Sequence, residues 1–598
     1  MKDFGYQEDS NTAILGDYHL WGRILVFCKR HWKLLSIAII LSLLITGATL
    51  GLPYLIRTAI DSYITNTDLD MSARLEGLGS ISMLFLGLVI TIVIATFFQV
   101  ITLEYTGQSI MHRIRQDLFA HMLNLDPLFF DTNPTGRLVT RLTNDIQNMH
   151  EMFTSVLVTV FNDLLRIGGI LVVLFLLNAR LALVMSVFVP IAVIITHLFA
   201  RLARAQFRRI RSQLAKLNSF LSESISGIST LQVFGRQKET RKLHEELSHS
   251  YLQRNLQQIK LFGTFMPLTE FMSSTAIALI LWFGGSEILR RQLTLGELVA
   301  FLSYMRLFFQ PLRELAQKYS IVQSAMASAE RIFQLFDTKS DRKLPSQAVV
   351  PKRINGKLSF NQVHFSYDED SKVLEDINFT INQGETVALV GTTGSGKTTL
   401  VNLLLRFYDP QKGHITIDDM DINRFSLTDL RQIVGVVLQD IFILQDTLLA
   451  NIVMDTDTSR RRVEQILEQT GIQRFVDRLP QGLDTIIGDG GQQLSTGEKQ
   501  LLAFARVLCR DPAILVLDEA TAAIDTESEN ILEQAIEKSF ASRTSLVIAH
   551  RLSTIRRADT ILVMKEGRII ERGSHEELMR LDGHYAELVA MDVYSEAV

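Results

Sequence analysis

The chain has 598 residues, of which 47% are hydrophobic and 21% are charged, and this composition excludes a disordered protein. Its 60 Lys and Arg against 64 Asp and Glu leave a net charge of −4, which excludes a generally basic nucleic-acid-binding protein. The two cysteines, Cys28 and Cys509, are too far apart in the sequence to suggest a disulfide framework, so we expect a reducing, cytosolic setting.

Six apolar segments in the first half of the chain predict membrane-spanning helices. The first two carry no charged residue, and each is long enough to cross about 30 Å of hydrocarbon. The third and sixth contain charged residues, and the fifth is short unless the residues before it extend the span. In chain order the segments are residues 34–56, 77–103, 152–178, 181–200, 271–286 (261–286 if extended) and 295–319.

Four charged residues in these segments are candidates for lining a transport pathway. Charge at membrane depth is costly and usually faces a protein interior or a water-filled cavity. The alternative is that these side chains only form ion pairs within the helical bundle. The candidates are Asp163, Arg166, Glu270 and Arg306.

The distribution of positive charge predicts how the spans are oriented. Residues 201–260 carry many Lys and Arg, whereas the loops on the other side carry few, so the positive-inside rule places both termini in the cytosol. The first 20 residues contain no apolar run typical of a cleavable signal peptide. The basic run 204–216 has few aromatic residues and follows a span, so we expect a helix near anionic headgroups there and no nucleic-acid site.

The N-terminal segment, residues 1–33, is predicted to precede the spans. Residues 17–33 combine Trp21 and Trp32 with basic residues, which favours a helix at the membrane surface. An ordinary extension of the first span is the alternative. The transmembrane domain itself is expected over residues 34–337.

The chain changes character after residue 337. A polar segment contains Pro345 and Pro351, and we place a linker at residues 338–355. Beyond it strand and helix patterns alternate, which predicts an α/β domain over residues 356–598.

A short apolar strand pattern, residues 386–390, runs into a glycine loop and then into an apolar helix pattern. Glycines let backbone N–H groups close around a phosphate, and the N-terminus of the following helix adds partial positive charge. Lys397 is expected to reach the β- and γ-phosphates of ATP, and Thr398 to bind Mg²⁺. A glycine turn without a ligand is the alternative. The predicted phosphate-binding residues are Gly391, Thr392, Thr393, Gly394, Ser395, Gly396, Lys397, Thr398 and Thr399.

A second apolar strand pattern, residues 513–517, ends in two acidic residues. Asp518 is placed to hold Mg²⁺, and Glu519 beside it to activate the attacking water. Adjacent acids are usually only solvated surface, but the carboxyl ends of parallel strands are where α/β sheets bind ligands.

The segment between these two motifs points to a family. Residues 494–500 (LSTGEKQ) resemble the signature sequence of ABC transporters. In the first half, Phe129, Phe130 and Asp131, followed by Pro134, Gly136, Arg141 and Asp145, resemble the first intracellular loop of the exporter branch, and residues 222–234 resemble the second. The resemblance extends to Tyr367, Gln439, Asp525 and His550, which match the aromatic, Q-loop, D-loop and H-loop positions.

This resemblance implies a six-helix transmembrane domain, all α, fused to an α/β P-loop ATPase domain. Two such chains would sandwich two ATP molecules, so one chain is a half-transporter. Short helices near residues 134–141 and 222–230 would transmit motion between the domains. The implied roles are adenine stacking by Tyr367, Mg²⁺ and γ-phosphate contacts by Gln439, contact with the partner's nucleotide by Ser495 and Gly497, a further nucleotide-site contact by Asp525, and catalysis by Lys397, Gln439, Glu519 and His550.

Two positions depart from the family signature. Thr496 stands where the family has a glycine, and Glu498 replaces a glutamine and adds negative charge near a polyanion. Both changes should weaken the ATP site that this signature completes. They favour a heterodimer with a second half-transporter over a homodimer.

The expected function is ATP-driven export of amphipathic or hydrophobic molecules, such as drugs, lipids or peptides, across the cytoplasmic membrane of a bacterium. An ATP-gated channel would have similar spans and is the alternative. A soluble ABC ATPase would share the second half of the chain but would lack the six spans.

Overall fold

The computed structural model divides into two compact units. The described residues are 18–340, 349, 354–367, 372–454, 456, 458–488, 491–518, 526–540, 543–548 and 555–596. The first unit comprises Met1–Leu125 and Asn133–Lys339, and the second comprises Asp126–Thr132 and Ser340–Val598. The division at Lys339 falls within the predicted linker, most of which lies outside the described residues.

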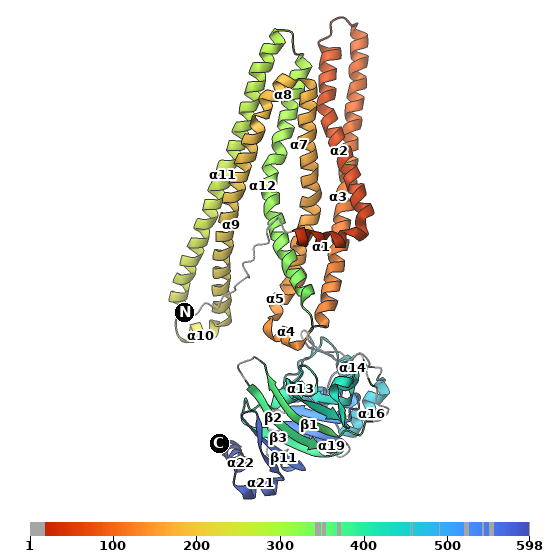
Figure 1. Ribbon diagram of the computed structural model, residues 1–598, viewed down its shortest axis with the longest axis vertical. Helices are drawn as coiled ribbons and strands as arrows, with labels where there is room; N and C mark the ends of the chain where they lie inside the picture. Colours follow the sequence, from red (N-terminus) through yellow and green to blue (C-terminus); the bar gives the residue numbers. More distant parts are fainter. Residues whose placement is uncertain are drawn as a thin grey trace. The chain divides into compact units, whose positions relative to one another are not determined.

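Helices make up the described part of the first unit (Figure 1). The two longest, α3 and α11, have 53 residues each, which at 1.5 Å per residue gives about 80 Å, well beyond a bilayer's hydrocarbon thickness. The helical elements are α1 (Tyr18–Cys28), η1 (Lys29–His31), α2 (Trp32–Ala59), η2 (Ile60–Ile64), α3 (Met71–Leu123), α5 (Thr135–Thr140), η3 (Arg141–Asp145), α6 (Ile146–Glu151), η4 (Met152–Leu157), α7 (Val158–Leu177), α8 (Ala179–Ser186), α9 (Phe188–Ser226), α10 (Ile228–Val233), α11 (Gln237–Leu289) and α12 (Leu295–Asp337).

Five helical stretches of the described chain are long and apolar enough to cross a membrane. The sixth predicted span, residues 295–319, forms part of α12, which is 43 residues long but is not among these five. Charged residues within α12, including Glu297 and Arg306, lower its hydropathy. The five stretches are His19–Ile64, Met71–Leu123, Thr135–Leu177, Ala179–Ser226 and Gln237–Leu289.

Apolar side chains both fill the bundle and cover its outside. One buried cluster joins α7, α8, α9, α11 and α12 and includes Ile170, Met272 and Phe308. Other large apolar side chains are open, such as Leu176 at 81% and Trp282 at 78% exposure. An apolar surface of this kind is typical of helices that face lipid.

The α1 helix is separated from α2 by the short turn η1 and lies across its direction (Figure 1). Arg23 donates two hydrogen bonds to Asp337 at the end of α12, at 2.6 and 2.8 Å, and its guanidinium lies 4.3 Å from the centre of the Phe333 ring. The chain therefore forms a helix of its own before α2. Both its placement at the membrane surface and the alternative, an extension of the first span, stay predictions.

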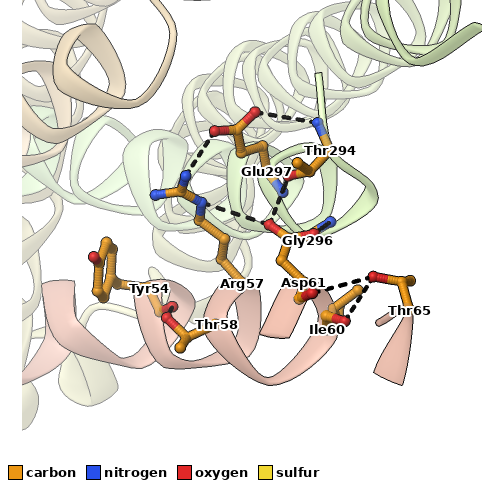
Figure 2. Close-up of polar contacts among 9 residues, drawn as sticks. All are labelled: Tyr54, Arg57, Thr58, Ile60, Asp61, Thr65, Thr294, Gly296 and Glu297. Carbon is orange, nitrogen blue, oxygen red and sulfur yellow. Dashed lines mark hydrogen bonds and ion pairs between the residues drawn. The ribbon is translucent and has the colours of Figure 1, made fainter. Parts of the chain in front are cut away.

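A polar network joins the end of α2 to the start of α12 (Figure 2). Arg57 Nη2 donates to Glu297 Oε1 at 2.7 Å, and Arg57 Nε lies 3.7 Å from Asp61 Oδ2. Asp61 accepts hydrogen bonds from the Thr294 hydroxyl at 2.6 Å and from the Gly296 N–H at 2.8 Å. A carboxylate of η2 therefore caps the N-terminus of α12 and fixes two helices that are far apart in the sequence.

The second unit is built on a six-stranded sheet in the order β12-β11-β3-β10-β9-β6. All neighbours in it pair in parallel except β11 with β12. A four-stranded antiparallel sheet, β2-β1-β4-β5, packs with it around a second apolar cluster. These sheets with their helices confirm the predicted α/β domain.

Two strands in the middle of the six-stranded sheet, Ile514–Asp518 and Thr544–Ile548, are buried throughout, as their apolar runs predict. In contrast, Arg568–Gly573 at the edge of this sheet alternates between exposed and half-buried residues. The strands of the second unit are two to ten residues long. They are β1 (Leu358–Ser366), β2 (Lys372–Ile381), β3 (Thr386–Gly391), β4 (Lys412–Ile417), β5 (Met420–Asp421), β6 (Val434–Val437), β7 (Asp446–Thr447), β8 (Ile486–Ile487), β9 (Ile514–Asp518), β10 (Thr544–Ile548), β11 (Thr560–Lys565) and β12 (Arg568–Gly573). The helical elements of this unit are α4 (Pro127–Thr132), α13 (Lys397–Leu404), η5 (Ile422–Arg424), α14 (Leu427–Ile433), α15 (Leu448–Val453), α16 (Arg460–Thr470), α17 (Gln473–Val476), η6 (Gly482–Asp484), α18 (Thr496–Cys509), α19 (Thr526–Phe540), α21 (His575–Leu581) and α22 (His584–Glu596).

Candidate nucleotide-binding site

The predicted glycine loop connects β3 to α13, as expected. Gly396 has φ +101°, a left-handed conformation that side chains disfavour, and it directly precedes α13. A Cβ atom on Gly391 would lie 2.3 Å from the carbonyl oxygen of Met564. Glycine is therefore required at both positions, and the loop backbone stays open to an anion at the start of a helix.

Lys397 lies folded over this loop. Its Nζ donates to the carbonyl oxygens of Gly391 at 2.7 Å and Thr392 at 3.0 Å. Burial lowers the pKa of Lys397, and the negative charge of Asp518 acts in the opposite direction. The two residues that the sequence assigns to phosphate and Mg²⁺ therefore interact electrostatically.

The sheet register explains why Asp518 lies next to the glycine loop. Asp518 at the end of β9 is opposite Ile548 in β10, which in turn is opposite Leu389 in β3. These strands run in parallel, so their carboxyl ends meet at one edge of the sheet. Asp518 is buried at this edge, with 9% exposure. Such an edge is where open α/β sheets bind their ligands.

Gln439 leaves the sheet at the same edge. Val437, the last residue of β6, is opposite Leu517 in β9, and Gln439 follows two residues later with an exposed side chain. The described residues contain no group of three or more His, Cys, Asp or Glu that could hold a metal. A hydroxyl from Thr398, an amide from Gln439 and one carboxylate fit Mg²⁺, which usually shares its ligands with water and substrate phosphates.

Tyr367 lies directly after β1 with 39% of its surface exposed. Its hydroxyl lies 3.3 Å from Thr399 Oγ1 on α13. The ring packs edge to face against Phe365 and Tyr408, with centroids 4.9 and 5.1 Å away. Part of the ring surface is therefore open, and the adenine-stacking role that the resemblance implies for Tyr367 stays a prediction.

The signature segment begins α18. Ser495 is the N-cap residue, and its hydroxyl accepts a hydrogen bond from the Glu498 N–H at 3.2 Å. The Glu498 carboxylate accepts in return from the Ser495 N–H at 2.8 Å, which completes a capping box. Gly497 is buried, and Thr496 is the first residue of the helix. Glu498 therefore helps to cap α18, a structural role that the comparison with the family signature did not predict.

Three predicted site residues, Glu519, Asp525 and His550, lie outside the described residues. The remaining predicted nucleotide-site residues lie in the second unit, around the glycine loop, at the carboxyl edge of the sheet and at the start of α18. Their roles stay predictions.

The charged candidates in the helical bundle are not all equivalent. Asp163 on α7 forms an ion pair with Lys318 on α12 at 2.6 Å, and each side chain is only 13% exposed. Arg166 is partly buried, whereas Glu270 and Arg306 are exposed in this chain. Sequence reasoning missed Lys318, although opposite charges in the two least apolar predicted spans were a signal for such a pair.

The fold and the site define a membrane protein that carries a helical bundle and a nucleotide-binding domain on one chain. Residues 35–312 match the family described as ABC transporter transmembrane region, and residues 374–522 match the family described as ABC transporter. The chain belongs to the ABC transporter family, in which ATP hydrolysis is coupled to transport. The predicted family and domain classes are therefore confirmed.

Several relatives match over nearly the whole chain. An uncharacterized ABC transporter ATP-binding protein of Bacillus subtilis (strain 168), YknV, is 36% identical and covers 100% of this chain and 98% of its own length. An ATP-dependent lipid A-core flippase of Thiobacillus denitrificans is 33% identical, and the match covers 96% of this chain and 98% of the flippase. A probable multidrug resistance ABC transporter ATP-binding/permease protein of B. subtilis (strain 168), YheH, is 38% identical, and the match covers 86% of this chain and 77% of YheH.

A solved structure, of a bacterial Atm1-family ABC exporter with ATP bound, resembles the whole chain. The TM-score is 0.79 at 29% sequence identity, and the match covers 94% of this chain and 98% of the other. The likeness confirms a helical transmembrane domain fused to a C-terminal nucleotide-binding domain.

Proposed function

We propose that this chain is one half of a dimeric exporter that uses ATP to move amphipathic or hydrophobic molecules out of the cytosol across the cytoplasmic membrane. The observation that carries this proposal is that the glycine loop and Asp518 meet at one sheet edge, on a chain whose helical bundle has an apolar outer surface. Relatives described as a lipid A-core flippase and a probable multidrug resistance transporter support drugs and lipids as the substrate classes.

In this proposal the glycine loop and Lys397 hold the phosphates, and Tyr367 holds the adenine. Thr398, Gln439 and Asp518 would hold Mg²⁺, which neutralises charge on the phosphates when bound. Glu519 would activate water and His550 would position the γ-phosphate. The preorganised backbone N–H groups and Lys397 stabilise the charge that develops during phosphoryl transfer.

The signature segment of this chain would act on a partner chain. Ser495 and Gly497 would complete the ATP site of the other chain, so each dimer has two composite sites. Thr496 adds a β-branched side chain and Glu498 a negative charge to this surface. We favour a heterodimer, because a partner with a glycine-rich signature would complete the site that contains Lys397 and Glu519. A homodimer is the alternative.

Transport into inverted membrane vesicles tests the export function. Vesicles containing the chain, alone or with a candidate partner, are given a fluorescent amphipathic dye, a fluorescent phospholipid or an apolar peptide. We expect ATP-dependent accumulation of at least one probe, and we expect Lys397→Ala and Glu519→Gln to abolish it. ATP-dependent ion currents without accumulation of any probe would contradict export and favour the channel alternative.

A further inference from the structure

An aromatic cluster connects the adenine platform, which we define as the ring of Tyr367, with α4. This helix comes from the first half of the chain but belongs to the second unit. The Tyr408 hydroxyl donates a hydrogen bond to Asp131 Oδ2 on α4 at 2.5 Å. On its other side, the Tyr408 ring packs edge to face against Tyr367, with centroids 5.1 Å apart and planes at 89°. One side chain thus contacts both the platform and α4.

We propose that Tyr408 is a positioning residue: when a nucleotide base binds to the adenine platform, Tyr408 shifts α4, and α4 in turn shifts the transmembrane helices. This inference rests on the proposed function and deepens it by naming a residue for coupling. Tyr408 lies outside the predicted nucleotide site, and no motif in the sequence assigned it a role.

The contact between Tyr408 and Asp131 is of the strong kind. A hydroxyl that donates to an ionised carboxylate forms a charge-assisted hydrogen bond, for which 2.5–2.7 Å is the usual distance. The start of the same helical segment is also held, because the Ser340 hydroxyl donates to Asp126 Oδ1 at 2.7 Å. The segment that includes α4 is therefore fixed at both ends within the second unit.

On the nucleotide side Tyr367 makes longer polar contacts and is held mainly by ring packing. The Tyr367 hydroxyl lies 3.3 Å from Thr399 and accepts from Asn402 Nδ2 at 3.4 Å, and both partners lie on α13 directly behind the glycine loop. The Phe365 ring packs against both tyrosines, with centroids 4.9 Å from Tyr367 and 5.6 Å from Tyr408. Close-packed rings have few free positions, so a base stacking on Tyr367 shifts the edge that Tyr408 contacts.

The connectivity gives this contact a route to the membrane. The chain enters α4 shortly after α3 ends at Leu123 and leaves it shortly before α5 begins at Thr135. We expected the coupling segment at residues 134–141, but the segment grouped with the nucleotide-binding unit is α4, Pro127–Thr132, immediately before it. The acidic residue of the Phe-Phe-Asp sequence is the one that meets Tyr408. Coupling roles for residues 134–141 and 222–230 stay predictions.

Tryptophan fluorescence offers a test that needs no transported substrate. All three tryptophans, Trp21, Trp32 and Trp282, lie in the first unit, so intrinsic tryptophan fluorescence reports that unit alone. The dimeric protein in detergent micelles, which add no tryptophan, is titrated with AMP-PNP, and nucleotide occupancy is measured separately by displacement of a fluorescent ATP analogue. In Tyr408→Phe we expect nucleotide affinity within about twofold of wild type but at least a twofold smaller fluorescence change at saturation.

Two further variants make the result specific. Asp131→Asn keeps an acceptor oxygen and should lose less of the signal than Asp131→Ala. The double variant Tyr408→Phe/Asp131→Ala should behave like the more impaired single variant, because both remove one shared contact. Tyr585→Phe is the matched control, since it removes a hydroxyl that contacts His575 at 2.7 Å in the same unit without contact to α4.

The possible failures are distinguishable. A full fluorescence change in Tyr408→Phe and Asp131→Ala, with nucleotide bound, would overturn the inference and leave the proposed function intact. Equal losses in Tyr585→Phe and Tyr408→Phe would also overturn it, because any loss of a hydroxyl would then suffice. If the wild-type protein binds AMP-PNP without any change in the first unit, the proposed coupled function itself fails.

Discussion

At the scale of single residues, the signature glutamate is the clearest departure from the family and also has a structural role. Glu498 closes the capping box of α18, in which either glutamate or glutamine satisfies the free N–H of the N-cap residue. Its charge is therefore not needed for the helix. In a composite ATP site, however, that charge would face the γ-phosphate bound by the partner chain.

We therefore expect Glu498→Gln to raise the ATPase activity of the purified dimer by about 3- to 10-fold, which corresponds to about 0.7–1.4 kcal/mol in the barrier. The reason is that the substitution removes a carboxylate near a polyanion and keeps the cap. The measurement is the steady-state rate at saturating Mg-ATP.

The matched control for this prediction is Glu577→Gln. Glu577 closes an equivalent capping box with Ser574 at the start of α21. We expect no change in ATPase activity there. A decrease in activity in Glu498→Gln would show that the carboxylate assists the reaction and would remove the main argument for a heterodimer.

The chemistry of the nucleotide site was predictable because it is local in sequence. The glycine loop and Asp518 each follow an apolar strand directly, so motif and strand together indicated the edge of a parallel sheet. The contact of Tyr408 with Asp131 was not predictable, since the two residues are 277 positions apart. Only the three-dimensional structure shows that Tyr408, which no motif singled out, contacts the Phe-Phe-Asp segment that resembles the exporter loop.

At the level of helices, polar contacts join α12 to several other helices of the first unit, among them α7 and α2. The same limit on sequence reasoning applies here, because apolar runs indicated the spans but not which charged residues meet. The Asp163–Lys318 pair joins α7 to α12, and the network of Asp61 and Arg57 joins α2 to α12. These two contact regions support different tests.

We expect Asp163→Asn to destabilise the protein by about 1–3 kcal/mol, because it leaves the buried Lys318 ammonium without its carboxylate. Adding Lys318→Met should restore part of this loss, since the uncompensated charge is removed as well. Thermal unfolding in detergent measures both effects.

The control pair is Arg236–Glu239, which is 66% and 69% exposed, and breaking it should cost about 0.5 kcal/mol or less. If Asp163→Asn leaves stability unchanged but alters transport, the pathway role predicted from sequence is favoured over the ion-pair alternative.

The close approach of α2 and α12 leaves no room for a side chain at Gly296. A Cβ atom on Gly296 would lie 2.6 Å from the Arg57 carbonyl oxygen and 2.6 Å from Asp61 Cγ. We expect Gly296→Ala to destabilise the protein by about 1–3 kcal/mol, because backbone has to move. In contrast, Gly285→Ala on α11 meets no atom within 4 Å and should stabilise its helix by about 0.5–1 kcal/mol. Equal effects of the two substitutions on the unfolding temperature would contradict the tight junction.

In the molecule as a whole, the chain carries one glycine loop with Lys397 and one signature segment with Ser495, and we place them in two different ATP sites of a dimer. Such an arrangement predicts intersubunit complementation, because a defect in one motif leaves the other motif usable by a partner. The composite site and the choice between heterodimer and homodimer can therefore be tested together.

The test mixes two inactive variants, Lys397→Ala and Ser495→Ala, during refolding or co-expression. Each variant alone should be inactive, since both of its composite sites lack either the lysine or the signature serine. A mixed dimer has one site in which both motifs are intact, so random pairing should restore about one quarter of the wild-type homodimer rate. Recovery requires that the wild-type chain hydrolyses ATP on its own, which is the homodimer outcome.

If the wild-type chain alone is instead inactive and gains activity only with a second half-transporter, the same two variants are tested with that partner. In that case Lys397→Ala should abolish activity. Ser495→Ala should reduce activity much less, because the partner's signature completes the site that contains Lys397. Activity of either single variant at the wild-type rate would contradict the composite site in both cases.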